Sequence, residues 1–102
     1  MATTITSASV LPNAGVRMPY VGLGTWLATP EEIEKAVDAA LTAGYRHIDT
    51  AFTYQNEAAI GNVLKKWLDG GKIKREELFI VTKLPSHAMR EELVEDFLKQ
   101  SL

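Results

Sequence analysis

The segment Leu78-Phe79-Ile80-Val81-Thr82 most constrains the fold of this chain, because it has no polar residue before its last position. A strand with one face in water alternates apolar and polar residues, and this run does not alternate. Such runs are typical of parallel strands that helices cover on both faces. We therefore expect a strand over residues 78–82, buried on both faces, in a parallel sheet.

Two amphipathic segments before this run are bounded by helix start and stop signals. Thr29-Pro30 opens the first, Glu32 completes a capping box, and Gly44 ends it. Asn56 is the expected cap of the second, and Gly70-Gly71 ends it. The apolar residues at helical spacing are Ile33, Ala36, Val37, Ala40 and Leu41 in the first segment, and Ile60, Val63, Leu64, Trp67 and Leu68 in the second.

Shorter elements complete an alternation of strands and helices. Short strands are expected at 20–23 and 45–48, and a hairpin from 7–11 and 16–20 around the turn 12–15. A third helix has no stop signal and carries Met89, Leu93, Val94, Phe97 and Leu98. Three βα units predict an α/β fold with right-handed crossovers, which the doubly wound sheet and the closed (β/α)₈ barrel both use.

Length and composition narrow the function classes. The chain has 102 residues, of which 46% are hydrophobic and 24% charged, which is expected of one globular domain. A net charge of −2 argues against a nucleic-acid-binding surface. Without cysteine, and with two isolated histidines, a disulfide framework or a metal site is not expected. The absence of a signal sequence or a membrane-length apolar run predicts a cytosolic protein outside the membrane.

In both candidate architectures, ligands bind at the carboxyl ends of the parallel strands. The residues that follow the three expected strands are Gly24, Thr25 and Trp26, then Asp49 and Tyr54, then Lys83. We therefore expect Asp49, Tyr54 and Lys83 to meet at one rim.

A tyrosine, a lysine and an aspartate at one rim have a joint chemical use. A tyrosine is a weak acid, since its ordinary pKa is about 10. A lysine ammonium against the phenol oxygen stabilises the phenolate and lowers that pKa, and an aspartate holds the ammonium in place. Such a tyrosine can donate a proton to a carbonyl oxygen that is becoming negative. The complementary reactant would be a bound hydride donor.

Simpler interpretations exist for each residue taken singly. An aspartate after a strand is commonly a turn or cap residue, and a lysine at a strand end is commonly a solvated charge. Trp26 and Phe52 could line a substrate cleft or cover the core. His47, inside an expected strand, is interpreted as a satisfied core histidine, and His87 as a surface or cap residue.

Three segments together resemble the N-terminal third of an aldo-keto reductase. They are VGLGTW (21–26), GYRHIDTAFTYQNEAAIG (44–61) and LFIVTKL (78–84), and the resemblance extends from about Leu11 to the last residue. It implies that residues 1–102 are the N-terminal part of a single (β/α)₈ TIM-barrel domain, with the hairpin closing the bottom of the barrel. This chain would be a truncated portion made of the hairpin and about three βα units.

The resemblance also implies an activity. Members of this family reduce aldehydes and ketones to alcohols with NADPH and without a metal. The family's catalytic residues match Tyr54 as proton donor, assisted by Lys83 and Asp49. Its cofactor-binding positions match Gly24, Thr25 and Asp49, and its substrate-binding positions match Trp26 and Tyr54. The expected partner is a small aldehyde or ketone, and the full-length form is expected to be a monomer.

The chain departs from the family pattern in two places. The family's catalytic histidine follows the fourth strand in an IHWP-like segment, and this chain stops before that strand. The loop KLPSHAMREE (83–92) replaces the more usual KLW start. The alternative hypothesis is therefore a catalytically inactive fragment that lacks the histidine and most of the cofactor site, and serves at most as an interaction module.

Overall fold

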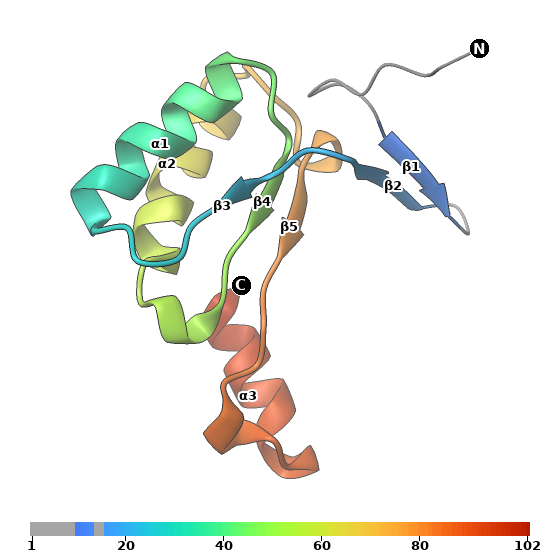
Figure 1. The fold of residues 1–102 in the computed structure, drawn as a ribbon, viewed down its shortest axis with the longest axis vertical. Coiled ribbons are helices and arrows are strands. Elements are labelled where there is room, and N and C mark those ends of the chain that lie inside the picture. Colours follow the sequence, from blue (N-terminus) through green and yellow to red (C-terminus); the bar gives the residue numbers. More distant parts are fainter. Residues whose placement is uncertain (1–9, 14–15) are drawn as a thin grey trace.

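A computed structural model describes residues 10–13 and 16–102 of this chain (Figure 1). Within these residues the strands form two sheets, an antiparallel pair and a parallel sheet in the order β3-β4-β5. The strands of the parallel sheet are β3 (Leu23–Gly24), β4 (His47–Asp49) and β5 (Phe79–Val81). The helices that alternate with them are α1 (Pro30–Thr42), α2 (Glu57–Asp69) and α3 (Glu91–Ser101). The predicted α/β fold with a parallel sheet is confirmed.

The predicted hairpin is present, with corrected bounds. β1 (Val10–Asn13) pairs antiparallel with β2 (Val16–Pro19), and Leu11 lies opposite Met18. Pro12 and Asn13, expected in the turn, are the last residues of β1. The rest of the expected turn, and residues 7–9 of the expected first strand, lie outside the described residues.

The strands of the parallel sheet begin later than predicted. Strands expected at 20–23 and 45–48 are observed at 23–24 and 47–49, because pairing with the neighbouring strand, not apolar content, defines where a strand begins. Before β3 the chain passes close to β4. A Cβ on Gly22 would lie 2.8 Å from Cγ of His47, so only glycine lets the backbone pass this ring.

The prediction that residues 78–82 are buried on both faces is wrong. The three residues of β5 are half-buried, although Leu78 just before them is buried. α1 and α2 lie together on one face of the sheet (Figure 1), and Ile80 packs against the core on that side. Within the described residues β5 pairs with β4 alone, so it is an edge strand of this sheet.

A compact core joins α1 and α2 to this covered face of the sheet. Its centre is Val37 and Ile48, which are completely buried, together with Ile33. Burial of one such aliphatic side chain contributes about 1.5–3 kcal/mol. The remaining buried members of this cluster are Leu41, Ala59, Ile60, Val63, Ile73 and Leu78.

The third helix is shorter than predicted and less covered. Met89, expected on its apolar stripe, precedes α3 and is 70% exposed, because a 3₁₀ turn over Ser86–Ala88 comes between strand and helix. Val94 and Leu98 on the stripe are also exposed. Among residues 10–13 and 16–102, no helix combines the length and the apolar composition that crossing a membrane requires.

The start of α1 follows the predicted capping pattern. The Glu32 N–H donates to Thr29 Oγ1 at 3.2 Å, and the Thr29 hydroxyl donates to Glu32 Oε1 at 3.1 Å. Pro30 is the first helical residue, and α1 ends at Thr42, two residues before Gly44 with φ +101°. The cap satisfies a backbone donor that the helix leaves free.

We predict that Thr29→Ala lowers the free energy of unfolding by about 1 kcal/mol, because the N-cap acceptor is lost. Urea unfolding followed by circular dichroism measures the change. Thr42→Ala is the matched control: its hydroxyl bonds back to the Asp38 carbonyl at the exposed end of the same helix, so its loss has little effect. Equal destabilisation by both changes would contradict the capping role of Thr29.

Candidate active site

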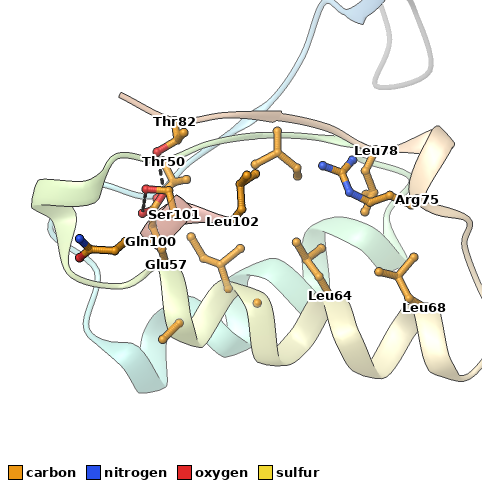
Figure 2. Close-up of a pocket in the computed structure, with 14 residues that line it drawn as sticks. Thr50, Glu57, Leu64, Leu68, Arg75, Leu78, Thr82, Gln100, Ser101 and Leu102 are labelled. Carbon is orange, nitrogen blue, oxygen red and sulfur yellow. Dashed lines mark hydrogen bonds between the residues drawn. The ribbon is translucent and has the colours of Figure 1, made fainter. Parts of the chain in front are cut away.

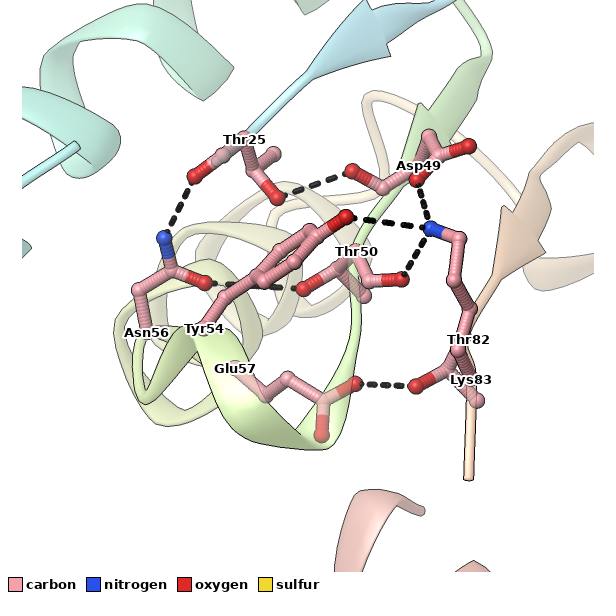
Figure 3. Close-up of polar contacts among 8 residues, drawn as sticks. All are labelled: Thr25, Asp49, Thr50, Tyr54, Asn56, Glu57, Thr82 and Lys83. Carbon is pink, nitrogen blue, oxygen red and sulfur yellow. Dashed lines mark hydrogen bonds and ion pairs between the residues drawn. The ribbon is translucent and has the colours of Figure 1, made fainter. Parts of the chain in front are cut away.

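The structure brings Asp49, Tyr54 and Lys83 together at the carboxyl end of the parallel sheet (Figure 3). The Lys83 ammonium forms a hydrogen-bonded ion pair with Asp49 Oδ1. It also donates to Tyr54 Oη at 3.4 Å and to the Thr50 carbonyl at 3.1 Å. One cation therefore contacts the carboxylate and the phenol that sequence reasoning placed beside it.

Strand register produces this meeting. Asp49 ends β4, with Gly24 of β3 on one side and Val81 of β5 on the other. Lys83 follows Val81 by two residues, so the two side chains project from the same face of the strand. Backbone bonds extend the pairing past the sheet, from Thr50 N–H to the Val81 carbonyl at 2.7 Å and from Phe52 N–H to the Lys83 carbonyl at 3.3 Å.

Tyr54 reaches the ammonium from a short 3₁₀ turn. The turn spans Phe52–Tyr54, directly after β4, and Gln55 closes it with φ +57°. Gln55 N–H donates to the Phe52 carbonyl at 3.3 Å. The tight turn brings the phenol back over the strand end, and Lys83 Nζ lies 5.1 Å from the centre of its ring.

Asp49 and Tyr54 both favour the charged form of Lys83. The hydrogen bond to Asp49 is the main cause that raises the pKa of Lys83 above its ordinary value of 10.5, burial opposes the rise, and the hydrogen bond to Tyr54 adds to it. Because this pKa is raised, the pair stabilises the fold at lower pH and stops doing so as pH rises through the folded-state pKa. Both side chains are about half exposed, so the contribution is about 1 kcal/mol or less.

The residues after β3 form the opposite side of the same rim. Thr25 is buried, and its hydroxyl donates to the Asp49 backbone carbonyl at 2.8 Å. Gly24 is exposed, and a Cβ built on it would meet no atom of residues 10–13 and 16–102 within 4 Å. Trp26 is 70% exposed, so its ring lies in solvent and does not cover the core.

The loop after Trp26 contains a strained backbone. Leu27 has φ +65°, a left-handed conformation that glycine adopts freely and leucine rarely. Such a residue costs about 1–3 kcal/mol unless surrounding contacts hold it. Its side chain is 78% exposed, so packing of the side chain does not hold it.

Asn56 does not act as the helix cap that the sequence predicts. It occupies the N-cap position of α2, but its side chain makes no capping bond. Its amide donates instead to the Thr25 carbonyl at 2.7 Å and the Ala28 carbonyl at 3.4 Å, and the residue is 2% exposed. The sequence indicated that Asn56 is a polar residue at a helix start, but it did not indicate its hydrogen-bond partners, which lie about thirty residues earlier in the chain.

Glu57 is a second residue that sequence reasoning missed. Each of its two carboxylate oxygens accepts a hydrogen bond from a hydroxyl group. The Thr82 hydroxyl donates to Oε2 at 2.6 Å, and the Ser101 hydroxyl donates to Oε1 at 2.7 Å. Thr82 directly precedes Lys83. A carboxylate in the first turn of a helix is also favoured by the helix dipole.

The two histidines and the ring of Phe52 have packing partners of their own. His47 is buried, as predicted, and its Nδ1 lies 3.1 Å from the Pro19 carbonyl. Its Nε2 has no hydrogen-bond partner among the described residues, so the expectation that it is satisfied holds only in part. His87 is exposed, as predicted, and both it and Phe52 pack edge-to-face on Phe97 of α3. In the described part of the chain, no three His, Cys, Asp or Glu side chains are grouped as a metal site.

A hollow of about 370 Å³ lies beneath the sheet (Figure 2), and Asp49, Tyr54 and Lys83 are not among the described residues that line it. It lies between α2 and β5, and Ser101 and Leu102 line one end of it. Its apolar lining includes Ile60, Leu64, Leu68, Leu78 and Ile80. None of the residues expected to bind substrate lines it, although Thr50 and Thr82, the sequence neighbours of Asp49 and Lys83, do.

Comparison with known proteins decides the family. The model of the Aldo/keto reductase family matches residues 20–102. This chain belongs to the aldo/keto reductase family. It is 46% identical over 99 residues to aldo-keto reductase family 1 member A1 of Mus musculus, which covers 96% of this chain and 30% of the mouse protein. It is 55% identical over 73 residues to the aldose reductase of Encephalitozoon cuniculi, covering 71% of this chain and 24% of that protein.

Solved structures of the family give the same result. The aldose reductase of Schistosoma japonicum superposes with a TM-score of 0.83 at 41% identity, over 93% of this chain and 31% of that one. This chain therefore spans about a third or less of the length of the aldo/keto reductases to which it is similar. The arrangement of β3, β4 and β5 is that of the corresponding part of a family member.

We predict that Asp49→Asn lowers the pKa of Lys83 toward 10.5, since the hydrogen-bonded carboxylate is the main cause of its rise. An NMR titration of the Lys83 side chain measures it, with Lys83→Arg to assign the signal. Glu95→Gln is the control, because it removes the partner of Lys99 on the exposed face of α3. An unchanged pKa of Lys83 in Asp49→Asn would contradict the pairing.

Proposed function

We propose that this chain supplies the proton-donating part of an NADPH-dependent carbonyl reductase, which converts aldehydes and ketones to alcohols. The observation that carries the proposal is the Lys83 ammonium, which contacts both the Asp49 carboxylate and the Tyr54 hydroxyl. Membership of the aldo/keto reductase family supports the same reaction class.

Each of the three side chains has a separate task in this reaction. Tyr54 donates its hydroxyl proton to the substrate's carbonyl oxygen as that oxygen becomes an alkoxide, and the product leaves as an alcohol. Lys83 stabilises the negative charge left on the phenol oxygen, from 3.4 Å. Asp49 holds the ammonium in place and keeps it protonated. Without the cation, proton loss from the phenol would be uncompensated at the moment of transfer.

The residues beside this group fit a nicotinamide cofactor. Gly24 is paired with Asp49 and leaves open space where a Cβ would project, so a flat ring could approach the backbone there. Gly24 and Asp49 would contact the cofactor's nicotinamide end, and the buried Thr25, whose hydroxyl bonds to the Asp49 backbone carbonyl, would hold Asp49 beside it. NADPH, when bound, supplies the hydride that the carbonyl carbon accepts.

Trp26 and Tyr54 would border the substrate. The Trp26 ring is 70% exposed next to Gly24 and Thr25, so it offers an apolar surface to a small aldehyde or ketone. Two of the relatives are named aldose reductases, after a sugar aldehyde. A small carbonyl compound is therefore the substrate class that we propose.

The remaining parts of the site would come from a closed barrel. The three described parallel strands would form one part of such a barrel's wall, and the chain spans about 30% of the mouse relative. In a (β/α)₈ barrel the loops after all eight strands build the active site. We therefore assign proton donation to this chain, and most of the cofactor contacts to strands that follow in the longer relatives.

We predict that Tyr54→Phe reduces turnover at least a thousandfold in a hybrid barrel, in which residues 20–102 replace the matching segment of the mouse relative. Affinity for NADPH stays close to that of the parent hybrid, because no cofactor contact is assigned to the lost hydroxyl. Steady-state reduction of a small aldehyde and cofactor fluorescence measure the two effects. Tyr45→Phe, well outside the rim, is the control. Turnover of Tyr54→Phe at the parent rate would remove Tyr54 from the mechanism.

We also predict that the 102-residue chain by itself binds NADPH only weakly and reduces no model aldehyde. Three strand ends provide few of the contacts that a large dinucleotide needs. Titration of NADPH fluorescence with the purified chain measures the affinity. Micromolar binding would contradict this division of the site.

A further inference from the structure

Two residues at the start of α2, its N-cap Asn56 and its first residue Glu57, contact the chain beyond both neighbours of the central strand β4. Asn56 reaches the loop after β3, and Glu57 reaches the residue after β5 (Figure 3). The central strand ends in Asp49, and the hydroxyl of the next residue, Thr50, lies 3.5 Å from Asn56 Oδ1. One short stretch of the chain is thus connected to all three strand ends.

The Asn56 side of this arrangement holds the strained loop. Its amide bonds to the carbonyls of Thr25 and Ala28, which flank Trp26 and Leu27. These bonds span the residue with φ +65° from both sides. A buried amide with two carbonyl partners replaces the side-chain packing that Leu27 lacks. Thr25, fixed in this way, in turn donates to the Asp49 backbone carbonyl.

The Glu57 side fixes the chain next to the cation. The hydrogen bond from the Thr82 hydroxyl to Glu57 Oε2 is 2.6 Å long, and Thr82 is the residue directly before Lys83. Thr82 and Lys83 project to opposite faces, so the bond pins the strand end from below while the ammonium points to the rim. The other carboxylate oxygen holds Ser101 at the end of α3.

We propose that Asn56 and Glu57 are positioning residues that set the places of Trp26 and Lys83 on either side of Asp49. This inference rests on the proposed function, because it gives the two contacts a task in the proton-donating site. Neither residue touches the reacting atoms; each acts through a neighbour. Asn56 acts through the backbone of the loop 25–28, and Glu57 acts through Thr82.

The Glu57 side is tested with three variants of the full 102-residue chain and an NMR titration of Lys83. Thr82→Val keeps the shape of the side chain but removes the hydroxyl, so the raised pKa of Lys83 falls toward its ordinary value. Thr82→Ser retains the hydroxyl and retains the wild-type pKa. Ser101→Ala removes the other hydroxyl on the same carboxylate and leaves the pKa of Lys83 unchanged.

Two results would overturn this side of the proposal. One is a wild-type pKa of Lys83 in Thr82→Val, and the other is an equal fall in Thr82→Val and Ser101→Ala. Hydrogen exchange of the Thr50 amide, which bonds to the Val81 carbonyl, reports whether β4 and β5 remain paired in each variant.

The Asn56 side gives an independent test that does not depend on Thr82. Asn56→Asp has nearly the same shape but removes both amide donors, so Leu27 leaves the left-handed conformation. The backbone chemical shifts of Thr25 and Leu27 report the change. Asn62→Asp, the same substitution on the exposed face of α2, leaves those shifts in place. Unchanged shifts in Asn56→Asp, or equal changes in both variants, would overturn it.

Both readouts are independent of catalysis. A hybrid barrel that reduces no carbonyl counts against the proposed function alone, because it says nothing about the positioning contacts measured in the 102-residue chain. Variants with wild-type Lys83 and Leu27 signals count against the positioning role alone, whatever the result of Tyr54→Phe.

Discussion

The parallel pairing of β4 with both of its neighbours is the constraint on which the site depends. Asp49 lies level with Gly24 and Val81, so the ends of three strands reach one edge of the sheet together. A slip of one residue in β5 would turn Lys83 to the opposite face, away from Asp49 and Tyr54. The core around Val37 and Ile48 opposes such a slip, because it would expose the apolar side of the sheet.

The charge of Lys83 connects this geometry to chemistry. A lone ammonium at a strand end would be a solvated charge of little consequence. Here it donates to a carboxylate, a phenol and a backbone carbonyl at once. The carboxylate keeps it charged, and the phenol gains a cation where negative charge would develop. The ion pair between Lys83 and Asp49 contributes little to folding, because both side chains are about half exposed. Its proposed contribution to catalysis is larger, because proton transfer needs the positive charge only beside the Tyr54 oxygen.

Local signals in the sequence predicted what depends on local structure. The Thr29 cap and the Asn56 and Gly70 boundaries followed from capping chemistry and helical periodicity. The meeting of Asp49, Tyr54 and Lys83 is not local, and it followed from the rule that the carboxyl ends of parallel strands lie at one edge. The strand bounds were displaced, since they depend on which neighbour pairs where. Burial of β5 on both faces was wrong because it assumed cover that no described element provides.

The supporting contacts could not be read from local pattern. The Asn56 side chain serves residues 25 and 28, and Glu57 serves Thr82 and Ser101, at separations of 25 to 44 residues. The left-handed backbone of Leu27 could not be predicted from the sequence, because glycine, not leucine, is the residue that indicates such a conformation. These features follow only when three strand ends are already side by side.

The proposed function depends most on the contact between Lys83 and Tyr54, and a nuclear Overhauser experiment on the folded chain tests this contact directly. Cross-peaks between the ε-methylene protons of Lys83 and the ring protons of Tyr54 are expected, because the ammonium lies 5.1 Å from the ring centre. Cross-peaks between Ile48 and Ile80, which pair in the sheet, show that the strands are in place. If those sheet signals are present while Lys83 and Tyr54 show none, the two side chains point apart and the proposed chemistry has no basis.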